Sequence, residues 1–432
     1  MLSPLDDRYK EKVVKLLDCF SGFAYTQQRV VVEIKYLQDL CKVFKHPIDI
    51  HINAFTITDD DYRKIIEIES VTNHDIKAIE YFLRDHLKKY VLNFDKPYLI
   101  HFGLTSQDVN SVAFSYNFKK GTSLMFEELE NLINEVDLLS EKCNEIVMMS
   151  RTHGQPATPI KLTDYFDFYV GRMSTIGCYL VYDNSKVTAK CGGAVGNLAA
   201  HKYVCPKINW NKFMNEFVSK FDLMCNEHTT QIDSYDSIAR VLSDLLQMCV
   251  IVKDYIENTW NYIKDNYFCQ SVNVTETGSS VMPHKVNPIN FENALGNISL
   301  AIGMLEAYIR DLPLSRYQRD LKDSTMLRSI GEVYGKIYLA LINTTQGTIK
   351  LHPNKQIIQD DLENHAEVIM EPIQTYLRFL GFDDAYEQAK IFSRGSHKLD
   401  LITIREKFIK TLNINETHKE KLLKLTTLNY LS

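Results

Sequence analysis

Apolar side chains recur every three or four positions over long stretches of this chain. Between Asp233 and Asp265 the repeating apolar positions are Ile238, Val241, Leu245, Cys249, Val252, Ile256 and Ile263. This spacing lines one face of an α-helix about 45 Å long, at a rise of about 1.5 Å per residue. The same spacing predicts further helices over residues 129–139, 162–181, 291–309 and 330–341.

Helices of this length, following one another along the chain, favour a bundle. Several of them carry apolar residues beyond a single stripe, so we expect copies of the chain to associate through the bundle. Glycine and proline are scarce, at 17 and 11 of 432 residues. This shortage of helix breakers agrees with long uninterrupted helices. The expected fold class is therefore all-α, around a central bundle of long helices.

Two breaks in the pattern suggest domain boundaries. Residues 93–97 interrupt the periodicity before the bundle, and residues 351–354 interrupt it again. In the last part of the chain, Pro372 and Gly381 indicate a helix with proline near its start and glycine past its end. We therefore expect three helical domains, over residues 1–97, 98–350 and 351–432.

Composition and charge argue against several classes of protein. Hydrophobic residues make up 45% and charged residues 24% of the chain, as in ordinary globular proteins. The net charge of −6 argues against a general nucleic-acid binder, which usually presents a basic face. No apolar run reaches the roughly 18 residues of a membrane span, and the polar first residues do not resemble a signal peptide. Nine Cys without a C-x-x-C pair indicate free thiols, so we expect a cytoplasmic protein.

The strongest chemical signal is one string between two predicted helices, Gly278-Ser279-Ser280-Val281-Met282-Pro283-His284-Lys285-Val286-Asn287-Pro288. A generic Gly-Ser-Ser segment is usually a helix–helix loop whose serines cap the next helix. The complete string, however, matches the G-S-S-x-M-P-x-K-x-N-P signature of the superfamily of fumarase, aspartase and argininosuccinate lyase. Chance agreement at so many positions is negligible. The chain therefore resembles lyases that release fumarate, which implies a fold with three helical domains around a long-helix bundle.

Other strings resemble one branch of that superfamily, the adenylosuccinate lyase family. Residues 72–81, Thr-Asn-His-Asp-Ile-Lys-Ala-Ile-Glu-Tyr, are similar to its N-H-D-V-K-A-V-E-Y motif. Residues 150–159, Ser-Arg-Thr-His-Gly-Gln-Pro-Ala-Thr-Pro, look like the segment that bears the general-acid histidine. Further matching segments are Arg8-Tyr9 and residues 101–106, 229–232, 315–320 and 323–328. The last two are similar to the family's nucleotide-phosphate segment, so the resemblance extends over most of the chain.

The resemblance implies a β-elimination that releases fumarate from adenylosuccinate, and also from the succinylated carboxamide intermediate of purine synthesis (SAICAR). A proton leaves the carbon beside a carboxylate, and the C–N bond to the purine amine breaks. Such a reaction needs an acid, a base and cations near the carboxylate. His153 is the expected acid, because histidine changes its charge around neutral pH. By carry-over from the family the base is Ser279, whose alkoxide Lys285 and loop N–H groups would have to stabilise; Ser280 is the neighbouring alternative.

The remaining expected site residues bind substrate, by the same resemblance. A lone helical histidine is more often a surface or core residue, but the place of His74 between Asn73 and Asp75 favours contact with a substrate carboxylate or with His153. Asn73 and Asp75 are expected to bind substrate with it. The succinyl carboxylates are expected to contact Lys285, Asn287, Thr105, Ser106 and Thr152. The phosphate is expected to contact Arg8, Tyr9, Ser324 and Arg328, since arginine pairs bidentately with phosphate. Gln231 and Arg319 would position the substrate between its two ends.

No motif points to a metal or to another cofactor, so we expect a reaction that uses none. Residues 191–196, Cys-Gly-Gly-Ala-Val-Gly, lack the spacing of a dinucleotide loop and the ending of a P-loop. They are better interpreted as a turn similar to the family's G-A-V-G-N segment. The sequence has no H-E-x-x-H motif or Cys/His ligand pair. Ser279 lies in no G-x-S-x-G elbow, which disfavours a hydrolase.

The motif residues lie on elements separated by helices of about 30–45 Å, yet they must meet around one small substrate. We therefore expect a homotetramer whose active sites are shared between chains. Two alternatives remain. One is another lyase of the superfamily, which the N-H-D and S-R-T-H-G-Q-P strings disfavour. The other is an inactive helical scaffold with a lyase fold, which the intact His153, Ser279, Lys285 and Asn287 disfavour.

Overall fold

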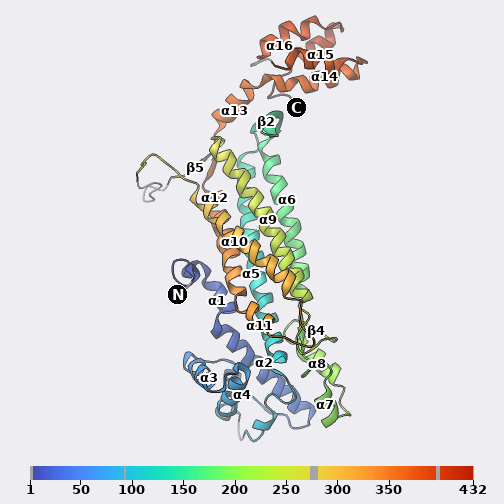
Figure 1. Cartoon of the computed structure of the whole chain (residues 1–432). Helices are drawn as coiled ribbons and strands as arrows, with labels where there is room; N and C mark the ends of the chain where they lie inside the picture. The colour runs from blue at the N-terminus through green and yellow to red at the C-terminus, as the bar shows by residue number, and fades with distance from the viewer. Residues whose placement is uncertain (1–2, 92–93, 273–280, 396–398, 432) are drawn as a thin grey trace. The chain divides into compact units, whose positions relative to one another are not determined.

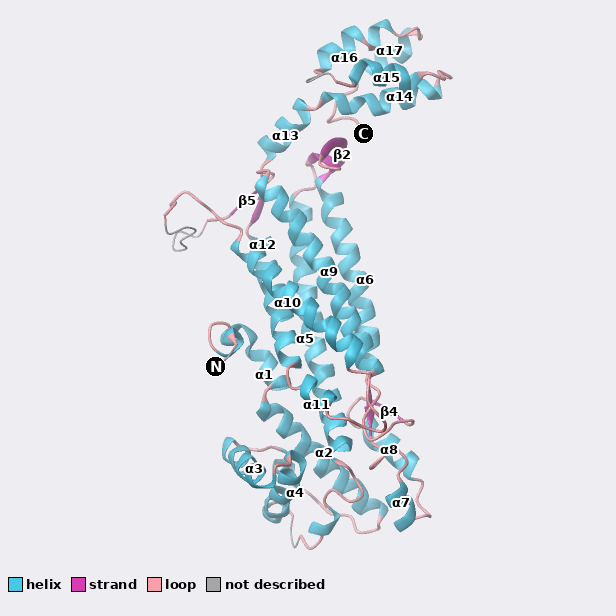
Figure 2. Cartoon of the chain, in the orientation of Figure 1, coloured by secondary structure: helices cyan, strands magenta, loops and turns pink. Residues whose placement is uncertain are grey.

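The computed structural model describes residues 3–91, 94–272, 281–395 and 399–431. The chain is predominantly helical, with short strands between helices (Figure 2). It divides into two compact units. The first comprises Met1–Asn131, Met173–Lys253 and Glu292–Asn343, and the second comprises Leu132–Arg172, Asp254–Phe291 and Thr344–Ser432. The predicted helical character is confirmed, whereas the three expected domains remain a prediction.

The apolar periodicity corresponds to five long helices (Figure 1): α5 (Ser106–Lys142), α6 (Leu162–Ser185), α9 (Asp236–Lys264), α10 (Ile289–Asp311) and α12 (Ile330–Ile349). All five predicted helices are therefore confirmed. In α9 the predicted apolar face is buried from Ile238 to Ile256, and Ile263 is partly buried. The helix forms along this stretch because burial of that face stabilises it. No helix in the described ranges is both long and apolar enough to cross a membrane.

The first unit also contains shorter elements. Its helices are α1 (Val14–Phe20), α2 (Gly22–Val43), α3 (Asp59–Thr72), α4 (Asp75–His86), α7 (Ala199–Val204), α8 (Trp210–Ser219) and α11 (Lys322–Leu327). Strands β3 (Thr188–Lys190) and β4 (Met224–Asn226) pair in parallel. Buried hydroxyls join α5 to α12, where Thr122 Oγ1 lies 2.7 Å from Tyr334 Oη. This contact fixes the mutual rotation of two apolar helices whose side-chain packing alone is less directional.

The second unit contains two antiparallel strand pairs and the C-terminal helices. β1 (Val147–Thr152) pairs with β2 (Gln155–Lys161), and β5 (Phe268–Gln270) pairs with β6 (Leu351–Pro353). The helices are α13 (Lys355–Asn364), α14 (Met370–Phe379), α15 (Ala385–Ser393), α16 (Leu401–Lys407) and α17 (Glu416–Leu423). Their apolar residues form a common core from Ala366 to Leu422. Pro372 lies near the start of α14 and Gly381, at φ 91°, past its end, as predicted.

Short 3₁₀ helices connect these elements: Pro4–Asp6, Lys10–Val13, Ile52–Phe55, Leu87–Lys89, Pro97–Leu99, Ala366–Ile369 and Ile409–Thr411. The break predicted at residues 351–354 is filled by β6 and by Asn354, whose side chain caps α13. The break in helical periodicity at residues 351–354 therefore corresponds to strand β6 and to the start of α13.

Candidate active site

His153 lies at the tip of the β1–β2 hairpin. His153 and Gly154 form its two-residue turn, because Thr152 pairs with Gln155. Their φ angles of 52° and 74° are both positive, the pattern of a type I′ turn. Thr152 and His153 are exposed at this tip, while Met148 and Met149 of β1 are fully buried. The start of β1 is therefore anchored in the core, and the turn holds the expected acid, His153, exposed to solvent.

The expected base, Ser279, and its neighbour Ser280 lie outside the described residues. The described part of the signature resumes at Val281. The backbone N–H of Lys285 donates to the carbonyl of Met282 at 3.1 Å, and the Lys285 side chain is exposed. Asn287 is half-buried just before α10, which begins at Ile289 after Pro288. The two expected carboxylate-binding residues thus lie within one short segment ahead of a long helix.

A pocket of about 270 Å³ in the first unit brings together Arg319, Ser324 and Arg328. Arg319 donates from Nη2 to Ser324 Oγ at 3.3 Å and from Nη1 to Gln231 Oε1 at 3.2 Å. Ser324 lies on α11, and Arg328 follows that helix directly. Two guanidinium groups and a hydroxyl on one pocket wall form an arrangement suited to a phosphate. The expected nucleotide-phosphate segment and Gln231 are therefore assembled in one place.

The Asn73-His74-Asp75 string connects α3 to α4. Asn73 has the left-handed conformation, φ 50°, just past the end of α3, and asparagine tolerates it better than most residues. His74 caps α4, because its Nδ1 accepts the backbone N–H of Lys77 at 3.2 Å. A neutral ring bonded in this way carries its hydrogen on Nε2. The side chain is 51% exposed, so a donor remains available for an anionic ligand.

Asp75 is one of the residues that line the same 270 Å³ pocket. Its Oδ2 accepts from Arg29 Nη2 at 2.7 Å, and Arg29 Nε donates to Asn110 Oδ1 at 2.8 Å. The Arg29 guanidinium also lies over the Tyr25 ring, 3.8 Å from its centre. Asp75 is therefore held in an internal ion pair with Arg29, and substrate binding by its carboxylate stays a prediction.

The segment that carries Thr105 and Ser106 is fixed by a fully buried ion pair. Lys190 Nζ lies 2.6 Å from Asp108 Oδ1, and both side chains are inaccessible to solvent. Asp108 also accepts the backbone N–H groups of Thr105 at 2.8 Å and of Gly192 at 2.7 Å. The start of α5 is thereby joined to the turn at residues 191–196. This turn, which lacks any nucleotide-loop motif, supports an expected carboxylate-binding segment.

His101, at the start of the same segment, contacts Glu33 of α2. His101 Nδ1 lies 2.6 Å from Glu33 Oε1, and the Glu33 side chain is fully buried. Burial lowers the pKa of His101, but the Glu33 carboxylate outweighs it, so the net pKa is raised. The Glu33 carboxylate therefore favours the protonated form of His101 beside the Thr105 segment.

Arg8 and Tyr9 belong to the N-terminal part of the first unit. Tyr9 Oη accepts from Asn293 Nδ2 of α10 at 3.1 Å, and the Arg8 guanidinium lies 5.9 Å from the Tyr9 ring centre. A further pocket is lined by both Leu5 and Arg328. The N-terminal segment therefore borders the residue that directly follows α11. Arg8 itself is exposed.

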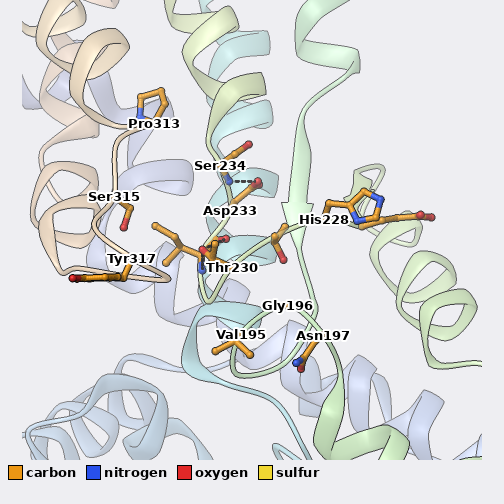
Figure 3. Close-up of a pocket in the computed structure, with 13 residues that line it drawn as sticks. Val195, Gly196, Asn197, His228, Thr230, Asp233, Ser234, Pro313, Ser315 and Tyr317 are labelled. Atoms are coloured by element: carbon orange, nitrogen blue, oxygen red, sulfur yellow. Dashed lines mark hydrogen bonds between the residues drawn. The ribbon is translucent and has the colours of Figure 1, made fainter.

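A second, larger pocket of about 570 Å³ includes Thr230 and Ile232, the chain neighbours of Gln231. Figure 3 shows this pocket. Its walls come from the turn at Val195 to Asn197, the segment from Glu227 to Ser234, and Pro313, Ser315 and Tyr317. The backbone N–H of Gln231 donates to the carbonyl of Gln318 at 3.2 Å. The two family segments at 229–232 and 315–320 are therefore hydrogen-bonded neighbours.

Sequence reasoning missed several polar residues of the 270 Å³ pocket, among them Arg29, Gln107 and Asn110. Gln107 directly follows the Thr105-Ser106 pair, which was the one available signal. Arg29 is separated from Asp75 by 46 positions and from Asn110 by 81, and no local pattern links them. Among the described residues, no group of three or more His, Cys, Asp or Glu side chains is placed to hold a metal ion.

Comparison with known proteins identifies the family. A model described as lyase matches residues 22–303, and one described as adenylosuccinate lyase C-terminal matches residues 315–431. The chain is 37% identical over 441 residues to the adenylosuccinate lyase of Haemophilus influenzae, covering 100% of this chain and 96% of that protein. The chain belongs to the adenylosuccinate lyase family. The resemblance drawn from its motifs is thus confirmed, and the chain is an enzyme of a lyase family.

Further relatives support the same conclusion. The adenylosuccinate lyase of Escherichia coli K12 is 35% identical over 444 residues, covering 100% of this chain and 96% of that protein. A fumarate lyase from Mesorhizobium superposes with a TM-score of 0.72 at 14% identity, covering 96% and 94% of the two chains. A 3-carboxy-cis,cis-muconate lactonizing enzyme from Pseudomonas putida gives 0.76 at 15% identity, covering 97% and 94%. At such low identity these two structures show that the fold is shared.

Proposed function

We propose that this enzyme cleaves adenylosuccinate to AMP and fumarate in purine nucleotide biosynthesis, and that it also releases fumarate from SAICAR. The observation that carries the proposal is full-length similarity to adenylosuccinate lyases, combined with the cationic pocket at Arg319, Ser324 and Arg328. A nucleotide substrate has a phosphate that such a pocket would bind. The reaction is a β-elimination at a C–N bond and uses no cofactor.

His153 is the proposed acid, which protonates the purine amine as the C–N bond breaks. Its exposed position at a hairpin tip supports this role, because a ring held there is accessible to a ligand. Ser279 is the proposed base, which removes the proton beside a carboxylate. Lys285 would stabilise the negative charge that develops on that carboxylate, together with Asn287, Thr105, Ser106 and Thr152.

The other end of the substrate lies in the 270 Å³ pocket. Ser324, Arg319 and Arg328 hold the phosphate, with Arg8 and Tyr9 from the N-terminal segment. Gln231 and Arg319 position the nucleotide, which their mutual hydrogen bond supports. His74 binds a substrate carboxylate through Nε2, since its Nδ1 is engaged in capping α4, and Asn73 and Asp75 fix its place.

The proposed functional unit is a cytoplasmic homotetramer with shared sites. Exposed aromatic side chains on α6 support an assembly, because Phe168, Tyr179 and Tyr182 are 57%, 59% and 62% exposed. Their spacing of eleven and three residues puts them on one helix face. A large exposed apolar face usually marks an interaction surface.

A substrate comparison tests the activity. Purified enzyme, treated with chelator, is incubated with adenylosuccinate, argininosuccinate or fumarate plus ammonia, and fumarate is followed by chromatography. We expect turnover of adenylosuccinate alone, unaffected by the chelator. Turnover of argininosuccinate instead would place the enzyme in another branch of the superfamily. A well-folded preparation without turnover on any of the three would favour the inactive scaffold.

A further inference from the structure

The His153 hairpin is tied to the C-terminal helices by a charged contact close to its tip. Arg151 of β1 donates from Nη2 to both carboxylate oxygens of Asp361 on α13, at 2.9 and 2.8 Å. Arg151 is two residues from His153, whereas Met149, the last fully buried residue of β1, is four residues away. The ion pair thus holds β1 at the point where the strand leaves the buried core.

A tyrosine completes a triangle with this pair. Tyr267, which is 2% exposed, donates its hydroxyl hydrogen to Asp361 Oδ2 and accepts from Arg151 Nη1 at 3.2 Å. Burial and the neighbouring Asp361 carboxylate raise the pKa of Tyr267, so the hydroxyl remains a donor. The carbonyl of Tyr267 also accepts the N–H of Asn354, the cap of α13, at 2.8 Å. All three side chains are therefore held by more than one partner.

The ion pair is better shielded than an ordinary surface pair. The Arg151 side chain is 29% exposed and the Asp361 side chain 17%. Such a pair constrains geometry more than a fully exposed one, because most of both side chains is shielded from bulk water. A second link, from Thr158 Oγ1 to Glu371 Oε2 at 2.5 Å, joins β2 to the C-terminal helices farther from the tip.

We infer that Asp361 and Tyr267 are positioning residues for the reaction, acting on His153 through Arg151. This inference rests on the proposed role of His153 as the acid. Successive side chains of a strand point to opposite faces, so Arg151 fixes one face of β1 while Thr152 and the turn remain free for substrate. A displacement of about 1 Å at a reacting group can reduce the rate about a hundredfold. Asp361 therefore sets the rate without touching substrate.

The test is a double-mutant cycle between Asp361→Asn and His153→Asn, measured on adenylosuccinate. Asparagine at position 153 keeps the left-handed turn, because it tolerates positive φ. We expect Asp361→Asn to lower kcat about tenfold or more while KM changes less than about threefold. In the His153→Asn enzyme the same substitution should leave the residual kcat within about twofold, since residues that act as a unit are not additive.

Matched variants separate positioning from general damage. Asp360→Asn makes the same change one residue away, where the half-buried side chain accepts from Gln356 Nε2 at 2.7 Å and has no hydrogen bond with Arg151 or Tyr267 among the described residues; it should leave kcat unchanged. Tyr267→Phe removes one hydroxyl and should lower kcat less than Asp361→Asn does, and Asp361→Glu should restore part of the activity. These two variants decide the matter if Asp361→Asn does not fold.

The outcomes distinguish the positioning role of Asp361 from the proposed acid role of His153. An equal fold-loss from Asp361→Asn with and without His153, or a loss confined to KM, would overturn the positioning role while leaving His153 as the acid. If His153→Asn is fully active, His153 is not the acid and Asp361 has nothing to position. In that case the activity on adenylosuccinate itself would still stand.

Discussion

At the residue scale, His153 occupies a backbone conformation that most side chains avoid. Its φ of 52° lies in the left-handed region, where asparagine, aspartate and glycine are the usual occupants of a type I′ turn. The turn alone would be served better by Asn-Gly than by His-Gly. Histidine is also tolerated in this region, and its imidazole offers a proton-transfer group that asparagine lacks.

This residue supplies a prediction in which stability and activity separate. His153→Asn should leave the thermal unfolding temperature unchanged or raise it, because the new side chain suits the turn. It should lower kcat by a factor of about 10² or more, the usual loss for a general acid. Unfolding followed by calorimetry and steady-state assays give both quantities. A variant that keeps most of its activity would contradict the proposed role of His153.

Several site residues could be named from sequence, and several could not. The strings around His74, His153 and Arg319 are contiguous, so their matches were visible. Arg29 and Asn110 were invisible, because they reach the pocket from α2 and α5 and meet only in the folded chain. The Arg151–Asp361 pair spans 210 positions, and no spacing rule links residues so far apart. Chemistry carried by contiguous motifs is thus easier to predict than the contacts that support it.

At the element scale, periodicity predicted the long helices because their burial repeats with the helix turn. It missed the β1–β2 hairpin, whose segment looked like a polar interruption containing Gly154 and two prolines. Pro156 and Pro159 cannot donate to a strand ladder and usually argue against a strand. They are tolerated here because the sheet has two strands, each with a free edge. The expected all-α class therefore holds for the chain, and the short β1–β2 hairpin that carries His153 is a local strand pair within it.

The start of α4 yields a prediction that separates capping from catalysis. His74→Asn can still cap the helix, since asparagine is a preferred N-cap residue, but it loses the imidazole Nε2. His74→Ala loses both. We expect kcat/KM to fall by similar factors in the two variants, whereas the free energy of unfolding should decrease by about 1 kcal/mol in His74→Ala alone. Denaturant unfolding with parallel assays measures this.

One result would contradict substrate binding by His74. If His74→Asn retains the activity of the parent enzyme while His74→Ala loses it, the histidine serves the helix start and not the substrate. The Asn73-His74-Asp75 string would then be a structural connection between α3 and α4. Its place in the family motif would reflect the left-handed Asn73 and the cap.

At the scale of the whole molecule, the two units divide the proposed site residues. His153, Lys285 and Asn287 belong to the second unit, while His74, Gln231 and Arg328 belong to the first. The proposed mechanism requires one substrate to contact members of both sets. In a closed symmetric assembly, chains packed through their long helices can supply these members to each site from different copies. An enzyme of this kind would have incomplete sites in any single chain.

Mixing two inactive variants tests whether one site draws residues from different chains. His153→Asn and Ser279→Ala chains are dissociated together in equal amounts and allowed to reassociate. If one chain supplies position 153 and another supplies position 279, each is intact with a probability of about one half. About one quarter of the sites, one half times one half, then regain both residues, and activity should recover to about 25% of the parent enzyme. Recovery requires dissociation, so the same mixture left undissociated is the control. Activity that stays at the background of the two variants would show that both residues come from one chain, and a monomer with full specific activity would exclude shared sites altogether.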